Sequence, residues 1–178
     1  MKEQTSGLYV EKLAEQGFIA SAYDASHYGE SGGGARLYEV PGDRVEDIRC
    51  AVDHVSKLPQ VAPDRIGALG ICAGGGYTVN AAQTEARIKA VGTVSAFDVG
   101  SARREEAGEP LLMINFVPMS AEEITQDTPE LYREGYDYYC TPRGQHPNAP
   151  GKYVFTASTS RWRSTRSSTS SRSLRGLC

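Results

Sequence analysis

The chain has 178 residues, of which 39% are hydrophobic and 23% are charged, a balance typical of a globular protein with one domain-sized core. No run approaches the ~18 consecutive apolar residues of a membrane-spanning helix, and the first residues lack the apolar core of a secretory signal, so we expect a cytoplasmic protein with no membrane partner. The four cysteines form no C-x-x-C pair, which argues against a disulfide framework and against a metal site. The formal net charge is −3, yet the last 22 residues carry five arginines and no acid.

The predicted elements begin with a helix from about residue 5 to residue 16. Thr5 or Ser6 is a suitable N-terminal cap for this helix, and Gly17 is a natural stop. The next segment, FIASAYD (18–24), is apolar and predicts a buried strand. A polar, glycine-rich loop, ASHYGESGGGAR, follows it.

Two more helices and two more strands continue the pattern. A helix over about 42–58 has valines and an isoleucine at steps of three and four residues, and a strand over 65–71 follows the turn VAPD. A helix over about 73–84 then precedes a strand over 88–97. Strands that alternate with helices predict right-handed crossovers and an α/β fold, with a parallel sheet flanked by helices.

The pattern weakens after residue 100. Residues 101–156 are predicted to form a helical and loop insert, which is broken at Pro129. From 157 to 178, 16 of the 22 residues are Ser, Thr or Arg, a composition that cannot bury enough apolar surface to order itself. We therefore expect one domain over 1–156 and a disordered tail over 157–178.

Five residues, Gly70-Ile71-Cys72-Ala73-Gly74, match the pattern G-x-nucleophile-x-G between a predicted strand and a predicted helix, which is the context that gives the pattern meaning. The pattern holds the nucleophile in a strained backbone conformation, so we expect that its neighbours at minus two and plus two must lack side chains. The N-terminus of the following helix favours negative charge on the sulfur and directs the Ala73 N–H at a developing oxyanion. The pattern thus predicts Cys72 as a nucleophile and Ala73 as an oxyanion donor.

Two nucleotide-binding motifs match this glycine-rich stretch less well. A phosphate-binding loop needs Lys and Ser or Thr where Gly76 and Tyr77 stand, and a dinucleotide-binding fingerprint needs a glycine in place of Val79. No cofactor is therefore expected. A buried, unreactive cysteine at a strand–helix junction is the plain alternative to a nucleophile.

Three stretches, YDASHYGESGG, RVEDIRCAVDHVSKLPQVAPDRIGALGICAGGG and IKAVGTVSAFDVG, resemble the α/β-hydrolase superfamily, in its dienelactone-hydrolase-like branch with a cysteine at the nucleophile elbow. The resemblance runs from about residue 2 to residue 156, and PELYREGYDYYCTPRGQHPNAP is similar to a segment that this branch inserts after its sixth strand. It implies cleavage of an ester, lactone or related acyl bond of a small-molecule substrate through a Cys–His–Asp triad, without a cofactor. It also implies a partial α/β-hydrolase fold, because the chain matches only the family's fourth, fifth and sixth strands.

By the same resemblance, the triad acid, the triad histidine and the second oxyanion donor are expected in segments that this chain lacks. His54 is predicted on a helix surface and His146 in a loop. His27 lies in the loop after the first predicted strand, as a candidate substrate contact or, more simply, a solvated loop residue. Asp98 follows the last predicted strand, at the sheet edge that holds Cys72, and is a candidate triad acid. A catalytically inactive, truncated hydrolase is thus the alternative to an active one.

The tail suggests two further hypotheses. One allowed back-translation of residues 158–177, shifted by one base, encodes an amphipathic segment similar to the family's continuation, so we interpret the tail as a reading-frame product or a truncation. Five arginines would also suit a nucleic acid, but the acidic body and the single aromatic residue of the tail argue against such a partner. Since the strands at 18–24 and 65–71 would lack the neighbour that the family places between them, we expect the isolated chain to be marginally stable. The sequence indicates no oligomeric state.

Overall fold

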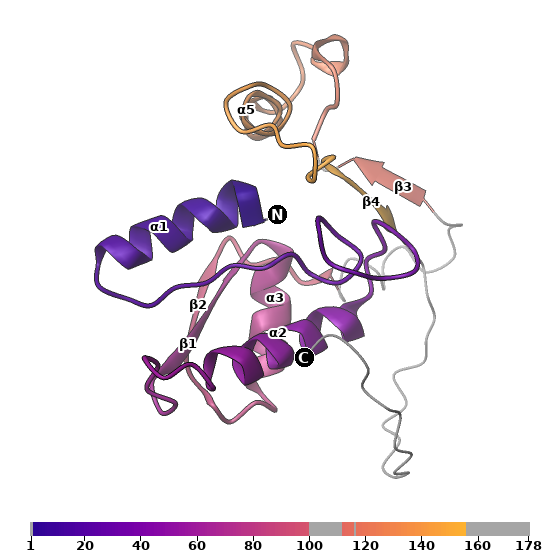
Figure 1. Cartoon of the computed structure of the whole chain (residues 1–178). Coiled ribbons are helices and arrows are strands. Elements are labelled where there is room, and N and C mark those ends of the chain that lie inside the picture. The colour runs from indigo at the N-terminus through magenta and orange to yellow at the C-terminus, as the bar shows by residue number, and fades with distance from the viewer. Residues whose placement is uncertain (1, 100–111, 116, 156–178) are drawn as a thin grey trace. The chain divides into compact units, whose positions relative to one another are not determined.

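The computed structural model describes residues 2–99, 112–115 and 117–155, and these residues form two units (Figure 1). One unit contains residues 48–99. The other combines residues 2–47 with the described residues from 112 to 155. The predicted tail and the first part of the predicted insert, 101–111, lie outside the described residues.

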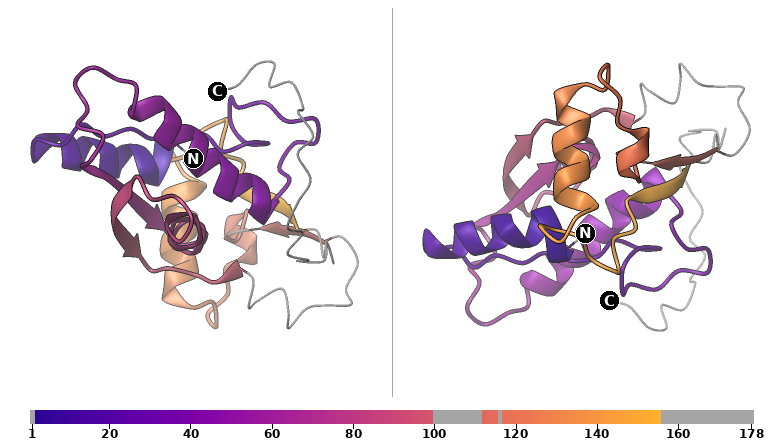
Figure 2. Two further views of the ribbon diagram at one scale, coloured as in Figure 1. Left: turned by 90° about the horizontal axis from the view of Figure 1, so that it is seen from below. Right: turned by 90° about the horizontal axis from the view of Figure 1, so that it is seen from above.

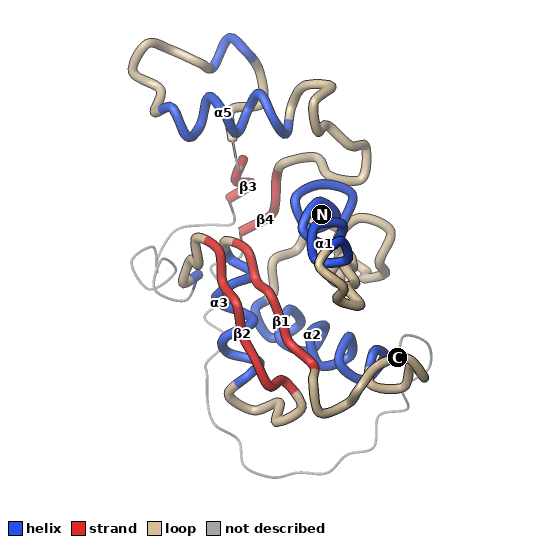
Figure 3. The backbone as a smooth tube through the Cα atoms, turned by 90° about the vertical axis from the view of Figure 1, so that its left-hand side faces the viewer, coloured by secondary structure: helices blue, strands red, loops and turns tan. Residues whose placement is uncertain are grey.

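The centre of the unit of residues 48–99 is a pair of parallel strands. β1 (Ile66–Ile71) pairs in parallel with β2 (Ile88–Val94), and α3 (Ala73–Ala82) connects them. The views in Figures 2 and 3 show α3 packed alongside both strands. The predicted strand–helix–strand crossover with a parallel sheet is therefore confirmed.

A small apolar core holds this unit together. Val52 of α2 (Pro41–Val55), Ile66 of β1 and Ile88 of β2 are buried against one another. Partly buried apolar side chains surround them: Ile48, Val55, Val61, Ala68 and Ala82. The apolar residues of α2 recur at steps of three and four, so one face of the helix supplies its share of this core.

An ionic link ties α2 to the chain just before β2. Arg87 Nη1 lies 2.6 Å from Asp53 Oδ1, and Arg87 Nη2 lies 2.7 Å from Glu85 Oε2. The Arg87 Nε–H also donates to Glu85 Oε1 at 2.8 Å. These hydrogen bonds from Arg87 lower the pKa of Glu85 to about 2, so the carboxylate stays ionised at all but strongly acidic pH.

In the other unit, α1 (Gly7–Glu15) follows a wider helical turn, η1 (Lys2–Ser6). Gly17, with φ 87°, donates its N–H to the Ala14 carbonyl oxygen at 2.9 Å, so the predicted stop is confirmed. The predicted side-chain cap at Thr5 or Ser6 is wrong: Ser6 is itself helical and makes no capping hydrogen bond, and the Thr5 hydroxyl lies 2.8 Å from the Tyr139 hydroxyl. Because η1 already supplies helical backbone before α1, Ser6 is not the first helical residue and α1 does not need a side-chain cap there.

The same unit contains α5 (Glu130–Tyr139), a 3₁₀ turn, η2 (Ala121–Glu123), and an antiparallel pair, β3 (Leu112–Asn115) with β4 (Lys152–Phe155). Pro129 stands directly before α5 and has the extended conformation that starts a helix, so the predicted break is confirmed. Within the described residues, no helix has both the length and the hydropathy needed to cross a membrane.

Residues 18–25 form neither a helix nor a strand, so the predicted strand over 18–24 is wrong. Phe18 is 63% exposed and Ile19 is 61% exposed, so this part of the segment is not buried either. None of the described strands pairs with it. A strand needs a partner for its backbone N–H and C=O groups, and an apolar run reveals only the propensity, not the partner.

Candidate active site

The chain changes direction sharply at Cys72, between the end of β1 and the start of α3. Cys72 has φ 54° and ψ −125°, a conformation that residues with a side chain rarely adopt. Such a conformation costs on the order of 1–3 kcal/mol and persists only where the surrounding structure enforces it. It agrees with the strained strand-to-helix turn that the sequence pattern predicts for a nucleophile.

Backbone hydrogen bonds from two directions enforce this turn. The Cys72 N–H donates to the Val94 carbonyl oxygen at 2.9 Å, at the end of the parallel ladder. The Cys72 carbonyl oxygen accepts hydrogen bonds from the Gly75 N–H at 2.9 Å and from the Phe97 N–H at 3.0 Å. The end of β2, the loop that follows it and the first turn of α3 therefore fix the peptide groups on both sides of Cys72.

The two glycines that flank the nucleophile in the motif are not equivalent. A Cβ at Gly70 would lie 2.6 Å from both Gly75 Cα and Thr78 Oγ1, so β1 and α3 approach too closely for a side chain there. At Gly74, apart from its chain neighbours and the backbone of α3 itself, no described atom lies within 4 Å of the Cβ position. Among the described residues, nothing requires the residue at plus two, Gly74, to lack a side chain, so this part of the prediction is wrong. The hydrogen bonds at Cys72 and the contact at Gly70 enforce the turn without crowding at Gly74.

Gly75 and Gly76 have a function that the motif does not predict. A Cβ at Gly75 would lie 2.9 Å from Ala96 Cβ, and a Cβ at Gly76 would lie 2.6 Å from the Phe97 carbonyl oxygen. These glycines let the loop of residues 95–97 pack directly on the first turn of α3. Glycines in a sequence do not indicate which segment they face, so only the fold reveals this contact.

The first turn of α3 supplies the electrostatics of the strand-to-helix turn at Cys72, the elbow between β1 and α3. Ala73 is the first residue of α3, so its N–H belongs to the first-turn amides that have no acceptor within the helix. The N-terminus of a helix stabilises a nearby anion by about 0.3–1 kcal/mol. The arrangement therefore suits negative charge that develops at the elbow, and the oxyanion role of Ala73 stays a prediction.

Asp98 lies in the same unit as Cys72, shortly after β2 ends. Its side chain is exposed, and its Cα is 3.9 Å from the position of a Cβ on Gly76. The carboxyl ends of parallel strands meet at one edge of a sheet, and both Cys72 and Asp98 follow such ends. The structure thus places Asp98 in the loop beside the elbow, and its role as a triad acid stays a prediction.

His27 belongs to the other unit, in the glycine-rich loop after α1. Its Nδ1 lies 2.8 Å from the Ala35 carbonyl oxygen and its Nε2 lies 3.0 Å from Asp43 Oδ2. Both ring nitrogens are therefore engaged, and these contacts hold the loop against the start of α2. The residue is partly buried, with 17% of its side chain exposed, rather than fully solvated. A contact between His27 and a substrate stays a prediction.

His54 belongs to the same unit as Cys72 but lies far from the elbow. His54 is exposed in the last turn of α2, two residues after Val52, which packs on the first residues of β1 and β2. Cys72 lies beyond the opposite end of β1, about 20 Å away along six residues of strand. His146 belongs to the other unit, between α5 and β4.

Three carboxylates in the first part of the chain form a cluster that contains a lysine. Oxygens of Glu3, Asp24 and Glu30 lie within 4.8 Å of one another, a grouping that would suit a divalent cation. Lys2 Nζ, however, lies 2.7 Å from Glu3 and from Asp24 and 2.9 Å from Glu30. The hydrogen bond from Lys2 lowers the pKa of Glu3. The lysine ammonium thus contacts all three carboxylates and offsets one of their negative charges, so the cluster is a salt-bridge centre and does not fit a metal site.

The sequence profile of the dienelactone hydrolase family matches residues 2–111, more than half of the chain. The chain belongs to the dienelactone hydrolase family. This member is 44% identical over 173 residues to the uncharacterized protein YcjY of Escherichia coli (strain K12), covering 85% of this chain and 56% of that protein. It is 35% identical over 175 residues to the uncharacterized protein PA2218 of Pseudomonas aeruginosa, covering 84% of this chain and 46% of that protein. The chain spans about half the length of these curated relatives.

Solved structures similar to this dienelactone hydrolase family member have the same fold. The crystal structure of the hypothetical protein PA2218 from Pseudomonas aeruginosa superposes with a TM-score of 0.73 at 32% identity, over 89% of this chain and 56% of that one. The α/β hydrolase GrgF from Penicillium sp. sh18 has a TM-score of 0.59 at 20% identity, over 84% of this chain and 56% of that one, and at this identity it shows the fold alone. The α/β-hydrolase fold implied by the sequence is therefore confirmed.

Proposed function

We propose that this dienelactone hydrolase family member cleaves an ester, lactone or related acyl bond of a small molecule, with Cys72 as the nucleophile. The backbone of the elbow carries the proposal, because φ 54° at Cys72 is maintained by three backbone hydrogen bonds at the N-terminus of α3. A buried, unreactive cysteine gains nothing from a conformation that costs free energy. Membership of a hydrolase family supports the same class of reaction.

The proposed reaction has two steps. A base takes the thiol proton, the Cys72 sulfur attacks the carbonyl carbon, and the carbon–oxygen bond to the leaving group breaks, which gives a thioester and an alcohol that receives the proton. The Ala73 N–H donates to the oxyanion of the tetrahedral intermediate. Water then attacks the thioester, releases the carboxylic acid and restores the thiol.

A second candidate function is a cysteine that is acylated but does not turn over. The position of His54 favours this second candidate. His54 lies near the start of β1, so no described residue of 48–99 places an imidazole beside Cys72. The engagement of both ring nitrogens of His27 favours it as well. A cysteine without a base retains only its intrinsic nucleophilicity.

Incubation of the 178-residue chain with p-nitrophenyl acetate tests both candidates. Peptide mass spectrometry locates the acetyl group, and the absorbance of p-nitrophenolate counts turnovers. We expect Cys72 to be acetylated ahead of Cys50 and Cys140, and Cys72→Ser to remove this labelling. Release that continues past one equivalent supports hydrolysis, whereas release that stops at one equivalent supports the second candidate. Equal labelling of Cys50, Cys72 and Cys140 would refute both.

A further inference from the structure

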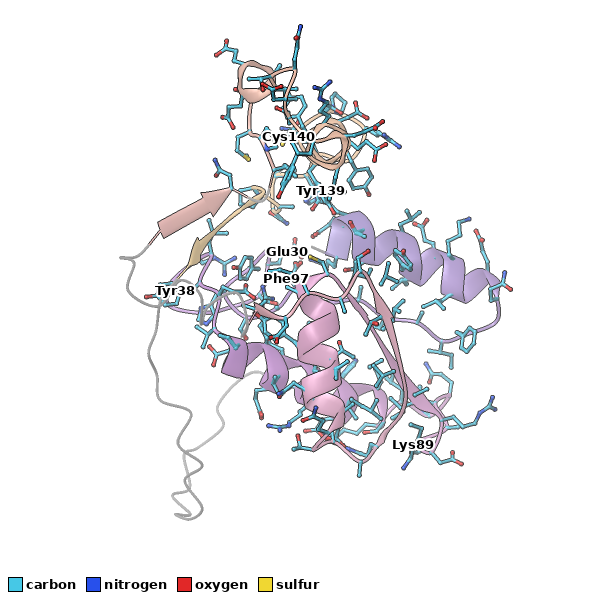
Figure 4. All side chains as sticks on the ribbon, turned by 180° about the vertical axis from the view of Figure 1, so that it is seen from behind. Glu30, Tyr38, Lys89, Phe97, Tyr139 and Cys140 are labelled. Carbon is cyan, nitrogen blue, oxygen red and sulfur yellow. The ribbon has the colours of Figure 1, made fainter. Side chains whose placement is uncertain are left out.

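Phe97 is attached to the nucleophile through its backbone. Its N–H donates to the Cys72 carbonyl oxygen at 3.0 Å, and its own carbonyl oxygen lies where a Cβ on Gly76 would be only 2.6 Å away. Ala96, one residue earlier, packs on Gly75 in the same way. The backbone of Phe97 is therefore fixed on two sides, by Cys72 and by the first turn of α3. Figure 4 shows Phe97 close to one end of α3.

The side chain of Phe97, in contrast, is 50% exposed. Single exposed apolar side chains are common on protein surfaces and by themselves need no explanation. This one lies at the carboxyl ends of two parallel strands, where ligands of open α/β sheets bind. It also lies on a loop whose close approach requires glycines at two positions of α3. The backbone that carries a large aromatic ring is thus fixed beside the candidate nucleophile, and half of the residue is exposed.

We propose that Phe97 is a specificity-determining residue, whose ring packs against an apolar acyl group of the substrate while Cys72 attacks its carbonyl carbon. The site therefore favours medium-length, apolar acyl groups over acetyl. This inference rests on the proposed function of Cys72 as a nucleophile. Apolar contact between the ring and an acyl chain stabilises the transition state only for substrates that have the chain. It therefore changes the ratio of the acylation rates of two substrates rather than the reactivity of the sulfur.

The test compares p-nitrophenyl hexanoate with p-nitrophenyl acetate as acyl donors. In each reaction the Cys72 sulfur forms a thioester and p-nitrophenolate leaves, and mass spectrometry of the Cys72 peptide gives the rate of acylation. We expect Phe97→Ala to lower the ratio of hexanoyl to acetyl transfer about tenfold, the discrimination typical of one apolar contact in a pocket. Phe97→Leu, which keeps an apolar side chain, should retain most of the ratio.

Val79→Ala is the matched control, because Val79 is 43% exposed on α3 and lies two turns beyond Cys72. It should leave the ratio unchanged. An unchanged ratio in Phe97→Ala, with Cys72 still acylated, overturns the role of Phe97 and leaves the proposed function intact. Failure of both esters to acylate Cys72 in the unsubstituted chain overturns both proposals. A variant that loses structure lowers both rates together, so the ratio separates specificity from stability.

Discussion

Replacement of Gly70 by alanine should destabilise the unit of residues 48–99, whereas the same replacement at Gly74 should not. A Cβ on Gly70 would lie 2.6 Å from Gly75 Cα and from Thr78 Oγ1, about 1 Å inside an ordinary contact distance. Overpacking of this kind costs roughly 1–3 kcal/mol, and the Gly75 atom is backbone that moves only with α3. At Gly74 the Cβ meets no described atom, and alanine there restricts the unfolded chain, which stabilises by about 0.4–1 kcal/mol.

Urea titration of each variant, followed by circular dichroism at 222 nm, measures the difference. The two variants should differ by about 1.5–4 kcal/mol in the free energy of unfolding, and each 2 kcal/mol corresponds to roughly 1 M urea in the midpoint. Gly34→Ala is a control for the substitution itself, because no described atom lies within 4 Å of its Cβ position in the other unit. The reasoning is refuted if Gly74→Ala destabilises as much as Gly70→Ala.

Three further predictions concern charged and buried groups. Glu85→Gln should lower the free energy of unfolding by about 1 kcal/mol at pH 7 once solvent screening is allowed for. Because Arg87 lowers the pKa of Glu85 from 4.5 to about 2, the stabilisation by the ionised carboxylate is complete above pH 4.5 and is lost as the pH falls toward 2. The urea midpoints of the variant and the unsubstituted protein should therefore converge as the pH falls toward 2. Burial raises the pKa of the Cys140 thiol, so iodoacetamide should alkylate Cys140 at pH 7 more slowly in the folded chain than in urea, and equal rates would contradict the burial. Lys2→Met leaves three carboxylates facing one another, and their repulsion is greatest where all three are ionised. The substitution should therefore lower the urea midpoint at pH 7 more than at pH 4. An effect that does not depend on pH would show that charge is not the cause.

The helices and the parallel strands were predictable because their patterns are local. The spacing of apolar residues in α2 and the alternation of strands with helices are visible in a short window, and tertiary packing did not override them. The segment 18–24 has an equally apolar sequence, but a strand also depends on a partner that lies elsewhere in the chain, and a short apolar run gives no information on that partner. The cap predicted at Ser6 is wrong because helical backbone in the preceding turn, η1, makes it unnecessary.

At the elbow, the sequence predicted the conformation of Cys72 but not what enforces it. Positive φ at Cys72 follows from the G-x-nucleophile-x-G pattern, which is a local rule. The hydrogen bond from Phe97 depends on the loop after β2, which is more than twenty residues away in the sequence. The glycines that admit this loop are Gly75 and Gly76 rather than Gly74, and only the approach of two distant segments distinguishes them.

The hydrogen bond from the Phe97 amide to the Cys72 carbonyl oxygen also makes that amide a reporter. The hydrogen of this amide can exchange with solvent only after the loop of residues 95–97 has separated from the elbow, an opening that also releases the strained backbone of Cys72. The protection factor of one peptide group therefore measures the fraction of time for which Cys72 is held in its positive-φ conformation. A ligand that tightens this loop would increase the protection and would stabilise the conformation of Cys72 without any contact with its sulfur.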